Sequence, residues 1–321
     1  MADMRIPVTL LTGFLGSGKT TLLNRILTDP SSPPCAVLVN EFGDVGIDGK
    51  LVVAAEDDLV ELQNGCVCCT VRGDLQKALG ELVKKRGRIL GRAKFDRIVI
   101  EASGLASPGP IAQTLEVDID LSEALALDGV VTLVHTAKIE EQLLGYPEAR
   151  DQIGYADVVV LNHSDRCSES AFAQAAHAVR QVNGAAPQRR ATRADLPIET
   201  LFGIERVDLA DVVASESEHA HASGVSTLAL RSDDALDLHK LKMWLRFLTG
   251  RQGTEILRLK GILRCQNQAA PVVVQAVYQW LEIGPGEGEP PQESNLVLIG
   301  RGFDPDEFER GWAACQLPAS I

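Results

Sequence analysis

The fold of this 321-residue chain is decided by the stretch Gly13-Phe14-Leu15-Gly16-Ser17-Gly18-Lys19-Thr20. It matches the phosphate-loop pattern G-x-x-x-x-G-K-[ST] at every fixed position. An apolar run over residues 6–12 precedes the loop and predicts a strand, and residues 19–27 after it predict a helix. This order suits phosphate binding, because the loop glycines and the helix N-terminus turn backbone N–H groups onto one anion.

Individual residues of this loop are predicted to bind phosphate or Mg²⁺. Lys19 is expected to place its charge on the β- and γ-phosphates and to act in catalysis, and the Thr20 hydroxyl is positioned to bind Mg²⁺. The residues expected to contact the nucleotide from this part of the chain are Gly13, Gly16, Ser17, Gly18, Lys19, Thr20 and Thr21.

Residues 1–203 alternate short apolar runs with amphipathic stretches, which is typical of repeated βα units. Strands are expected at 6–12, 36–40, 97–101, 129–134, 157–161 and 188–192, and helices at 19–27, 72–87, 110–117 and 168–182. We therefore predict an α/β phosphate-loop domain, in which helices flank a mainly parallel sheet.

The composition changes after residue 203. Residues 204–224 are acidic, with one basic residue among them, and predict a solvated linker. Further strands are expected at 226–230, 255–265, 272–280 and 295–300, and helices at 236–249 and 305–315. Residues 225–321 are thus predicted to form a smaller α+β domain.

Charge and hydropathy exclude several classes of protein. The chain has 31 basic and 44 acidic residues and a net charge of −13. This balance argues against a nucleic-acid or acidic-membrane partner, since both attract basic faces. No apolar run approaches the roughly eighteen residues of a membrane-spanning helix, and the first residues lack the features of a secretion signal. A cytoplasmic location is expected.

The tetrapeptide Asn162-His163-Ser164-Asp165 follows an apolar strand and resembles the N-K-x-D signature for guanine, with His163 in place of lysine. A carboxylate such as that of Asp165 accepts hydrogen bonds from the N1–H and the 2-amino group of guanine, whereas adenine offers neither donor. A polar turn at a strand end is the alternative interpretation, and the change to histidine is compatible with weaker selectivity for guanine.

The stretch Glu101-Ala102-Ser103-Gly104 ends another predicted strand. An acidic residue at this position in phosphate-loop proteins holds Mg²⁺, so Glu101 is a predicted magnesium ligand and catalytic residue beside Thr20, and Gly104 is placed to meet the γ-phosphate. Residues 40–48 follow the second strand, where a γ-phosphate sensor would lie. No glutamine or arginine finger is identifiable, so slow hydrolysis is expected.

Three of the seven cysteines, Cys66, Cys68 and Cys69, lie within four residues of one another. Thiolates this close repel one another unless a cation shares their charge, and Zn²⁺ or Co²⁺ with sulfur ligands would do so. Glu41 is a candidate ligand from outside the cluster. A redox pair and buried small side chains are the alternatives that the spacing leaves open.

Together, the segments GFLGSGKT, VNEFGDVGID, ELQNGCVCCT, VIEASGLASPGP and LNHSD resemble the CobW-type family of metallochaperone GTPases. Residues 258–263 resemble a stretch of the family's C-terminal domain. The resemblance implies slow hydrolysis of GTP to GDP, and delivery of Zn²⁺ or Co²⁺ to a client metalloprotein.

The resemblance also implies roles for individual residues. It assigns Mg²⁺ to Thr20 and Glu101, and Zn²⁺ or Co²⁺ to Cys66, Cys68 and Cys69 with Glu41 nearby. The residues that it implies for GTP are Gly16, Gly18, Lys19, Thr20, Asn162 and Asp165.

The sequence departs from the family pattern at three places. His135 stands where aspartate is usual, His163 replaces lysine, and the histidine-rich loop is reduced to His219 and His221. Two competing functions are a nucleotide-dependent thiol redox switch and an ATP-using kinase or ATPase. The sequence leaves open whether the chain forms a homo-oligomer and which client it serves.

Overall fold

The computed structural model describes residues 5–39, 51–55, 58–61, 72–86, 95–204, 225–252, 255–277 and 280–317. The chain divides into two compact units, which comprise Met1–Ala178 with Ala186–Val207, and Val179–Ala185 with Asp208–Ile321. The domain boundaries 1–203, 204–224 and 225–321 stay a prediction. Among the described residues we find no helix that combines the length and apolar composition of a membrane-spanning segment.

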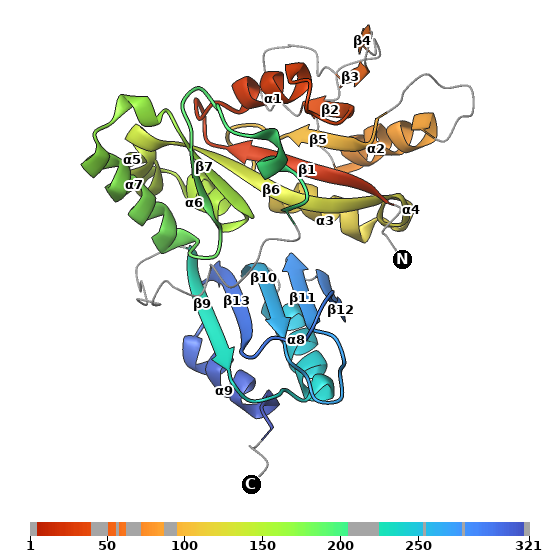
Figure 1. Ribbon diagram of the computed structural model, residues 1–321, viewed down its shortest axis with the longest axis vertical. Coiled ribbons are helices and arrows are strands. Elements are labelled where there is room, and N and C mark those ends of the chain that lie inside the picture. Colours follow the sequence, from red (N-terminus) through yellow and green to blue (C-terminus); the bar gives the residue numbers. More distant parts are fainter. Residues whose placement is uncertain are drawn as a thin grey trace. The chain divides into compact units, whose positions relative to one another are not determined.

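The first unit is built on a sheet with the strand order β4-β3-β2-β5-β1-β6-β7-β8 (Figure 1). Its strands are β1 (Ile6–Gly13), β2 (Cys35–Val39), β3 (Leu51–Ala55), β4 (Asp58–Glu61), β5 (Arg97–Glu101), β6 (Leu125–His135), β7 (Val158–Asn162) and β8 (Gln188–Arg190). The strands from β2 to β8 in this order pair in parallel, which confirms the predicted fold class. An antiparallel hairpin, β3 and β4, extends one edge and was not predicted.

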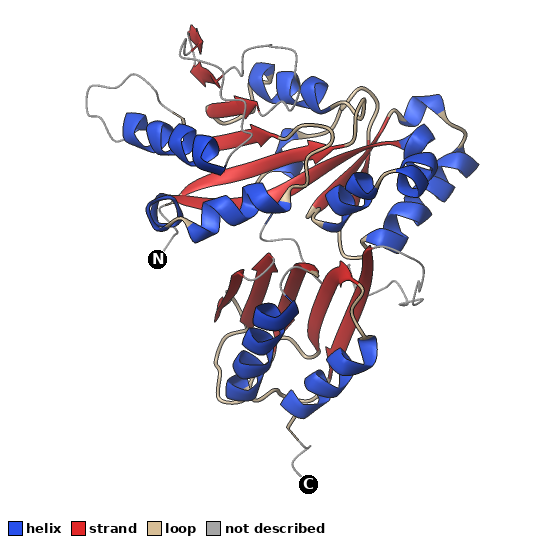
Figure 2. Ribbon diagram, turned by 180° about the vertical axis from the view of Figure 1, so that it is seen from behind, coloured by secondary structure: helices blue, strands red, loops and turns tan. Residues whose placement is uncertain are grey.

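Helices lie on both sides of this sheet (Figure 2). They are α1 (Lys19–Thr28), α2 (Arg72–Arg86), α3 (Gly109–Val117), α4 (Ile119–Ala124), α5 (Ile139–Gly145), α6 (Pro147–Gly154) and α7 (Glu169–Val182). The strands between them are almost continuously apolar because both faces of the sheet are covered, and all five residues of β7 are buried. The short helices α4, α5 and α6 were not predicted.

One hydrophobic core lies between the sheet and α1. Leu22, Leu23 and Ile26 of α1 are buried in the same cluster as Val99 of β5 and Val131 of β6. Because these helix residues recur one turn apart, they form a single apolar face. Their burial holds the start of α1, and with it the preceding glycine loop, against the carboxyl ends of the parallel strands.

A β-bulge near the start of β6 interrupts its pairing with β1. Val8 lies opposite Leu127, but Thr9 lies opposite Gly129, so Asp128 is the extra residue in the ladder. A bulge of this kind redirects a side chain that regular pairing would place elsewhere.

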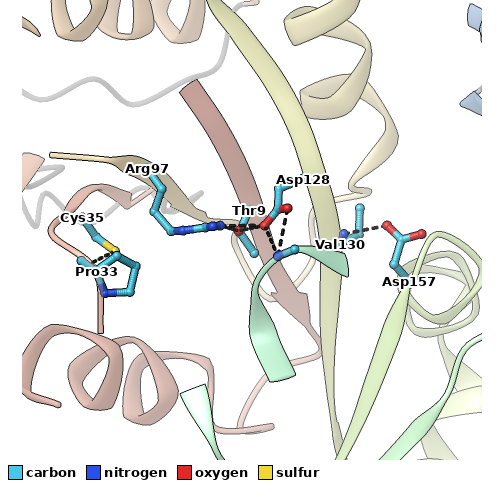
Figure 3. Close-up of polar contacts among 8 residues, drawn as sticks. Thr9, Pro33, Cys35, Arg97, Asp128, Val130 and Asp157 are labelled. Atoms are coloured by element: carbon cyan, nitrogen blue, oxygen red, sulfur yellow. Dashed lines mark hydrogen bonds and ion pairs between the residues drawn. The ribbon is translucent and has the colours of Figure 1, made fainter. Parts of the chain in front are cut away.

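The Asp128 carboxylate is the centre of a buried polar network (Figure 3). It accepts hydrogen bonds from Arg97 Nη1 at 2.6 Å, from Thr9 Oγ1 at 3.1 Å and from the backbone N–H of Gly203 at 3.0 Å. The Arg97 guanidinium also lies 4.0 Å from the centroid of the Phe202 ring. The network thus ties the end of the first unit's described chain, at residues 202–203, to strands β1, β5 and β6.

The second unit is a five-stranded antiparallel sheet with the order β12-β11-β10-β13-β9. Its core joins α8 residues such as Leu241 and Leu245 to Phe308 and Trp312 of α9, and the Trp312 indole N–H donates to the carbonyl of Arg231 at 2.9 Å. The elements are β9 (Val225–Ser232), α8 (Leu238–Gln252), β10 (Ile256–Leu263), β11 (Val272–Val277), β12 (Trp280–Pro285), β13 (Ser294–Arg301) and α9 (Pro305–Cys315).

One strand prediction in this unit is wrong. The run 272–280 was expected to be a single strand, but β11 and β12 form an antiparallel hairpin in which Val277 pairs with Trp280. Residues 278–279 are tyrosine and glutamine, so none of the usual turn residues marks the reversal in the sequence.

The buried pair of Arg97 and Asp128 should contribute strongly to stability. Asp128→Asn is expected to lower the free energy of unfolding by about 3 kcal/mol, since it leaves the arginine charge buried beside a neutral partner. Chemical denaturation of the purified chain measures the change. Glu169→Gln is the matched control, because it breaks an ion pair with Arg190 of the same 2.6 Å length between exposed side chains. Equal losses in the two variants would contradict this prediction.

Candidate functional site

The phosphate loop joins β1 to α1 in a conformation that leaves helix donors available. Gly16 and Gly18 have φ angles of 74° and 105°, which side-chain-bearing residues rarely adopt. Gly18 is the N-cap of α1, and no side chain caps the helix there. The first N–H groups of a helix have no partner within the helix, so this turn presents them to an anion.

Lys19 begins α1 and is buried with its ammonium group turned into the loop. Lys19 Nζ donates hydrogen bonds to the carbonyls of Gly13 at 2.7 Å and Phe14 at 3.4 Å. Burial lowers the pKa of Lys19, and the negative charge of Glu101 partly opposes that effect. The Ser17 hydroxyl is also buried, and it has no hydrogen-bond partner in the described part of the chain. Both side chains therefore offer donors that a phosphate group could use.

Thr20 and Glu101 meet at the ends of two neighbouring strands, β1 and β5. Thr20 Oγ1 donates a hydrogen bond to Glu101 Oε1 at 3.0 Å. Two oxygen ligands this close, from a hydroxyl and a carboxylate, fit the donor set that Mg²⁺ takes beside a nucleotide. The geometry therefore brings together the two residues predicted to hold magnesium.

Gly104 lies directly against the phosphate loop. A Cβ atom on Gly104 would approach Leu15 Cδ2 to 2.5 Å and the Leu15 backbone to 3.1 Å. The buried Gln152 side chain supports this turn by donating to the carbonyls of Gly104 at 3.0 Å and Ala106 at 3.1 Å. The predicted γ-phosphate contact thus comes from a turn that is packed against the loop and hydrogen-bonded to α6.

Asn162, the last residue of β7, connects the phosphate loop to a second loop. Its Nδ2 donates to the Ser17 carbonyl at 2.8 Å, and its Oδ1 accepts from the Ala194 N–H at 2.8 Å. A Cβ atom on Gly18 would lie 2.3 Å from Asn162 Nδ2, so only glycine allows this approach. Asn162 therefore positions both loops, in addition to the nucleotide contact predicted from the sequence.

The two remaining residues predicted for the nucleotide lie at exposed positions. Asp165 is exposed in a 3-10 helix, Ser164–Arg166, directly after Asn162. Thr21 is exposed in the first turn of α1. Because both side chains are exposed, they are available to a ligand.

The loop at residues 192–194 is part of the site that sequence reasoning missed. The Ser164 hydroxyl lies 3.1 Å from the Thr192 hydroxyl, and Arg193 and Ala194 have positive φ angles of 52° and 55°. The position of this loop in the sequence could have predicted it. The loop follows the last parallel strand, and it therefore lies at the same edge of the sheet as the phosphate loop.

The residues predicted for Zn²⁺ or Co²⁺, namely Glu41, Cys66, Cys68 and Cys69, lie outside the described residues. Within the described ranges, no group of three or more His, Cys, Asp or Glu side chains could hold a metal ion. Burial raises the pKa of the Cys35, Cys265 and Cys315 thiols to about 11. A raised pKa disfavours the thiolate form that binds metals.

Removing the amide donor of Asn162 should weaken nucleotide binding. Asn162→Asp keeps the shape of the side chain but places a carboxylate oxygen against the Ser17 carbonyl, so we expect an affinity loss of about tenfold or more. Titration with a fluorescent GDP analogue measures it. Asn24→Asp, the same change at an exposed position of α1, is the control and should bind as the wild type does. Unchanged affinity in Asn162→Asp would contradict the bridging role.

Comparisons with known proteins agree with this geometry. The family model described as CobW/HypB/UreG, nucleotide-binding domain, matches residues 7–190, and the model of the cobalamin synthesis protein cobW C-terminal domain matches residues 225–316. The zinc chaperone YjiA of Escherichia coli (strain K12) is 32% identical over 317 residues, which cover 96% of this chain and 98% of that protein.

Two further relatives extend the likeness. The zinc chaperone CobW of Pseudomonas aeruginosa is 32% identical over 345 residues, covering 94% of this chain and 88% of that protein. The crystal structure of Zn(II)-bound YjiA GTPase from E. coli matches with a TM-score of 0.74 and 31% identity, covering 98% of this chain and 99% of that one. These matches confirm the family that the sequence motifs resemble. The chain belongs to the CobW/HypB/UreG family and carries the cobW C-terminal domain.

Proposed function

We propose that this protein is a cytoplasmic GTPase that uses slow GTP hydrolysis to deliver Zn²⁺ to a client metalloprotein. The observation that carries the proposal is the Asn162 side chain, which joins the phosphate loop at Ser17 to the loop at Ala194. This bridge supports a nucleotide site in which the phosphate loop and the guanine-type motif of residues 162–165 act together at one edge of the sheet. Relatives that match along nearly the whole chain are named zinc chaperones, which supports the second half of the proposal.

The phosphate chemistry follows from charge. The N–H groups of the first turn of α1 and the ammonium group of Lys19 surround the place where a triphosphate would lie, and both oppose the negative charge that develops on the transferred group. Mg²⁺, held by Thr20 and Glu101, would neutralise charge on the β- and γ-phosphate oxygens. Attack of a water oxygen on the γ-phosphorus breaks its bond to the bridging oxygen and yields GDP and phosphate.

The proposed slow rate of GTP hydrolysis rests on the lack of an identified glutamine or arginine finger in the described part of the site. Gln152 is buried, and its Nε2 donors are used by the carbonyls of Gly104 and Ala106, so this side chain supports the turn at Gly104. Slow turnover suits a protein that uses the nucleotide as a timed switch, because the loaded state must persist until a client is met.

The metal half of the proposal rests on Cys66, Cys68 and Cys69. Their spacing crowds three thiolates, and burial keeps three of the other cysteines protonated. We propose that this cluster, with Glu41, holds Zn²⁺ as cargo. A shell of thiolates and one carboxylate binds zinc firmly, yet it can release the ion if one ligand is withdrawn. Co²⁺ is the alternative ion for the same ligands.

Guanine selectivity should depend on Asp165. Asp165→Asn is expected to weaken GTP binding about 100-fold, since it exchanges a carboxylate that accepts two hydrogen bonds for an amide. The variant should bind xanthosine triphosphate more tightly than the wild type does, because xanthine has a carbonyl where guanine has its amino group. Competition against a fluorescent GDP analogue measures both affinities. Asp120→Asn, at an exposed position of α4, is the control and should bind GTP as the wild type does. If the wild type prefers ATP over GTP, the protein is instead an ATP-using enzyme.

Loss of two thiolates should separate metal binding from nucleotide binding. The double variant Cys66→Ala, Cys68→Ala is expected to bind zinc more than about 100-fold more weakly than the wild type. A loss of that size is already typical when a residue that only hydrogen-bonds to a metal ligand is removed. GDP affinity should stay unchanged. Competition with a chromogenic chelator measures zinc, and Cys167→Ala, at a half-buried cysteine, is the control. Wild-type zinc affinity in the double variant would refute the site, and formation of a reversible disulfide that zinc does not prevent would favour the redox alternative.

A further inference from the structure

Two histidine rings stack at the carboxyl edge of the sheet, next to the phosphate loop. His135 ends β6 and His163 follows Asn162, the residue that pairs with His135 in the ladder. The ring centroids are 4.3 Å apart and the ring planes differ by 25°. The two rings are therefore stacked, one of the arrangements in which aromatic rings attract each other.

The first ring, His163, contacts the phosphate loop itself. His163 Nε2 lies 3.3 Å from the Gly16 carbonyl, which can only accept a hydrogen bond, so this contact requires a proton on Nε2. His163 also has a φ angle of 59°, a left-handed conformation that costs energy for a residue with a side chain. The stack on His135 is the interaction that compensates for this backbone and keeps the ring on the loop.

The second ring, His135, is buried and surrounded by groups that disfavour a positive charge. The side chain is 7% exposed, and its Nδ1 has no hydrogen-bond partner within the described residues. The pKa of His135 is lowered, first by burial and then by His163, by Lys138 of the following 3-10 helix and by Arg166 of the 3-10 helix after His163. The charged or titratable groups that act on this imidazole are all bases, and a backbone hydrogen bond at His135 opposes them only in part, so the neutral ring is the favoured form.

We propose that His135 is a positioning residue of the nucleotide site, which holds His163 against the phosphate loop only while its own ring is neutral. The proposal rests on nucleotide binding at this loop, which is part of the proposed function. It makes the affinity for a guanine nucleotide depend on the charge of the ring that stacks on His163.

The direction of the pH dependence follows from the burial. The folded protein favours neutral His135, so the stack is complete above the ordinary pKa of histidine, near 6.5, and is lost only as the pH falls further, through the lowered pKa of the folded protein. Protonation then places a charge beside His163, Lys138 and Arg166. When the stack opens, His163 is no longer held in its left-handed conformation, and the Gly16 carbonyl loses its donor.

The test compares a ring that titrates with one that does not. A fluorescent GDP analogue is titrated at about pH 7.5 and about pH 5.5, on either side of the ordinary histidine range, into the wild type and His135→Phe. Phenylalanine keeps a flat ring for the stack but cannot take a proton. The terminal phosphate of GDP also titrates in this range, so the difference between the two proteins is the measured quantity.

We expect the dissociation constant of the wild type to rise about threefold more than that of His135→Phe between the two pH values, because a pKa gap of one unit is only partly expressed when the ring is partly protonated at the lower pH. His177→Phe, at an exposed position of α7, should keep the wild-type slope. Equal slopes in the wild type and His135→Phe would overturn the proposal but not the proposed function. Absence of GDP binding by the wild type at about pH 7.5 would overturn both.

A second measurement does not depend on a variant that folds. In the nucleotide-free wild type, NMR follows the ring protons of His163, whose chemical shifts carry the ring-current effect of His135. Loss of that effect as the pH falls through the histidine range supports the proposal. Retention of the stacked shift after His135 is protonated would overturn it.

Discussion

The first turn of α1 is the constraint on which the nucleotide site depends. The helix begins after a left-handed glycine, which has no side chain to cap the leading N–H groups, so these donors suit an anion or water. Everything else at the site is arranged around that turn. Parallel strands end side by side there, and the loops after β1, β5, β7 and β8 therefore reach the same place although they are far apart in the sequence.

Two polar devices hold these loops where the helix requires them. Asn162 spans from the phosphate loop to the loop at Ala194, and each of its amide atoms makes one hydrogen bond. Asp128 connects the strands that support these loops to the chain at Gly203. Its bulge turns the carboxylate toward Arg97, Thr9 and the Gly203 N–H. Both side chains are buried and make hydrogen bonds within the protein in place of hydrogen bonds to water, so their positions are fixed.

The sequence predicted the parts of this molecule whose signal is local. The phosphate loop, the strand at 97–101 and the helix at 305–315 have patterns contained within their own residues, and the structure has the latter two at the predicted bounds. Pairing between distant segments carries no such pattern. The bulge at Asp128, the hairpin of β3 and β4, and the approach of Ala194 to Asn162 depend on register between strands, which the residues of one strand do not specify. Thr20 and Glu101 are hydrogen-bonded to each other, and their shared role in binding Mg²⁺ stays a prediction from the motif set.

The hydrogen bonds of Lys19 to the carbonyls of Gly13 and Phe14 have a thermodynamic consequence. The loop supplies its own carbonyl oxygens to the ammonium group, and a bound phosphate would compete with these oxygens for the same N–H donors. The binding constant for nucleotide therefore reports a difference between two well-satisfied states. A substitution that strengthens the internal contacts would weaken nucleotide binding without touching the ligand. A substitution that weakens these contacts would raise the affinity of the loop for any polyanion.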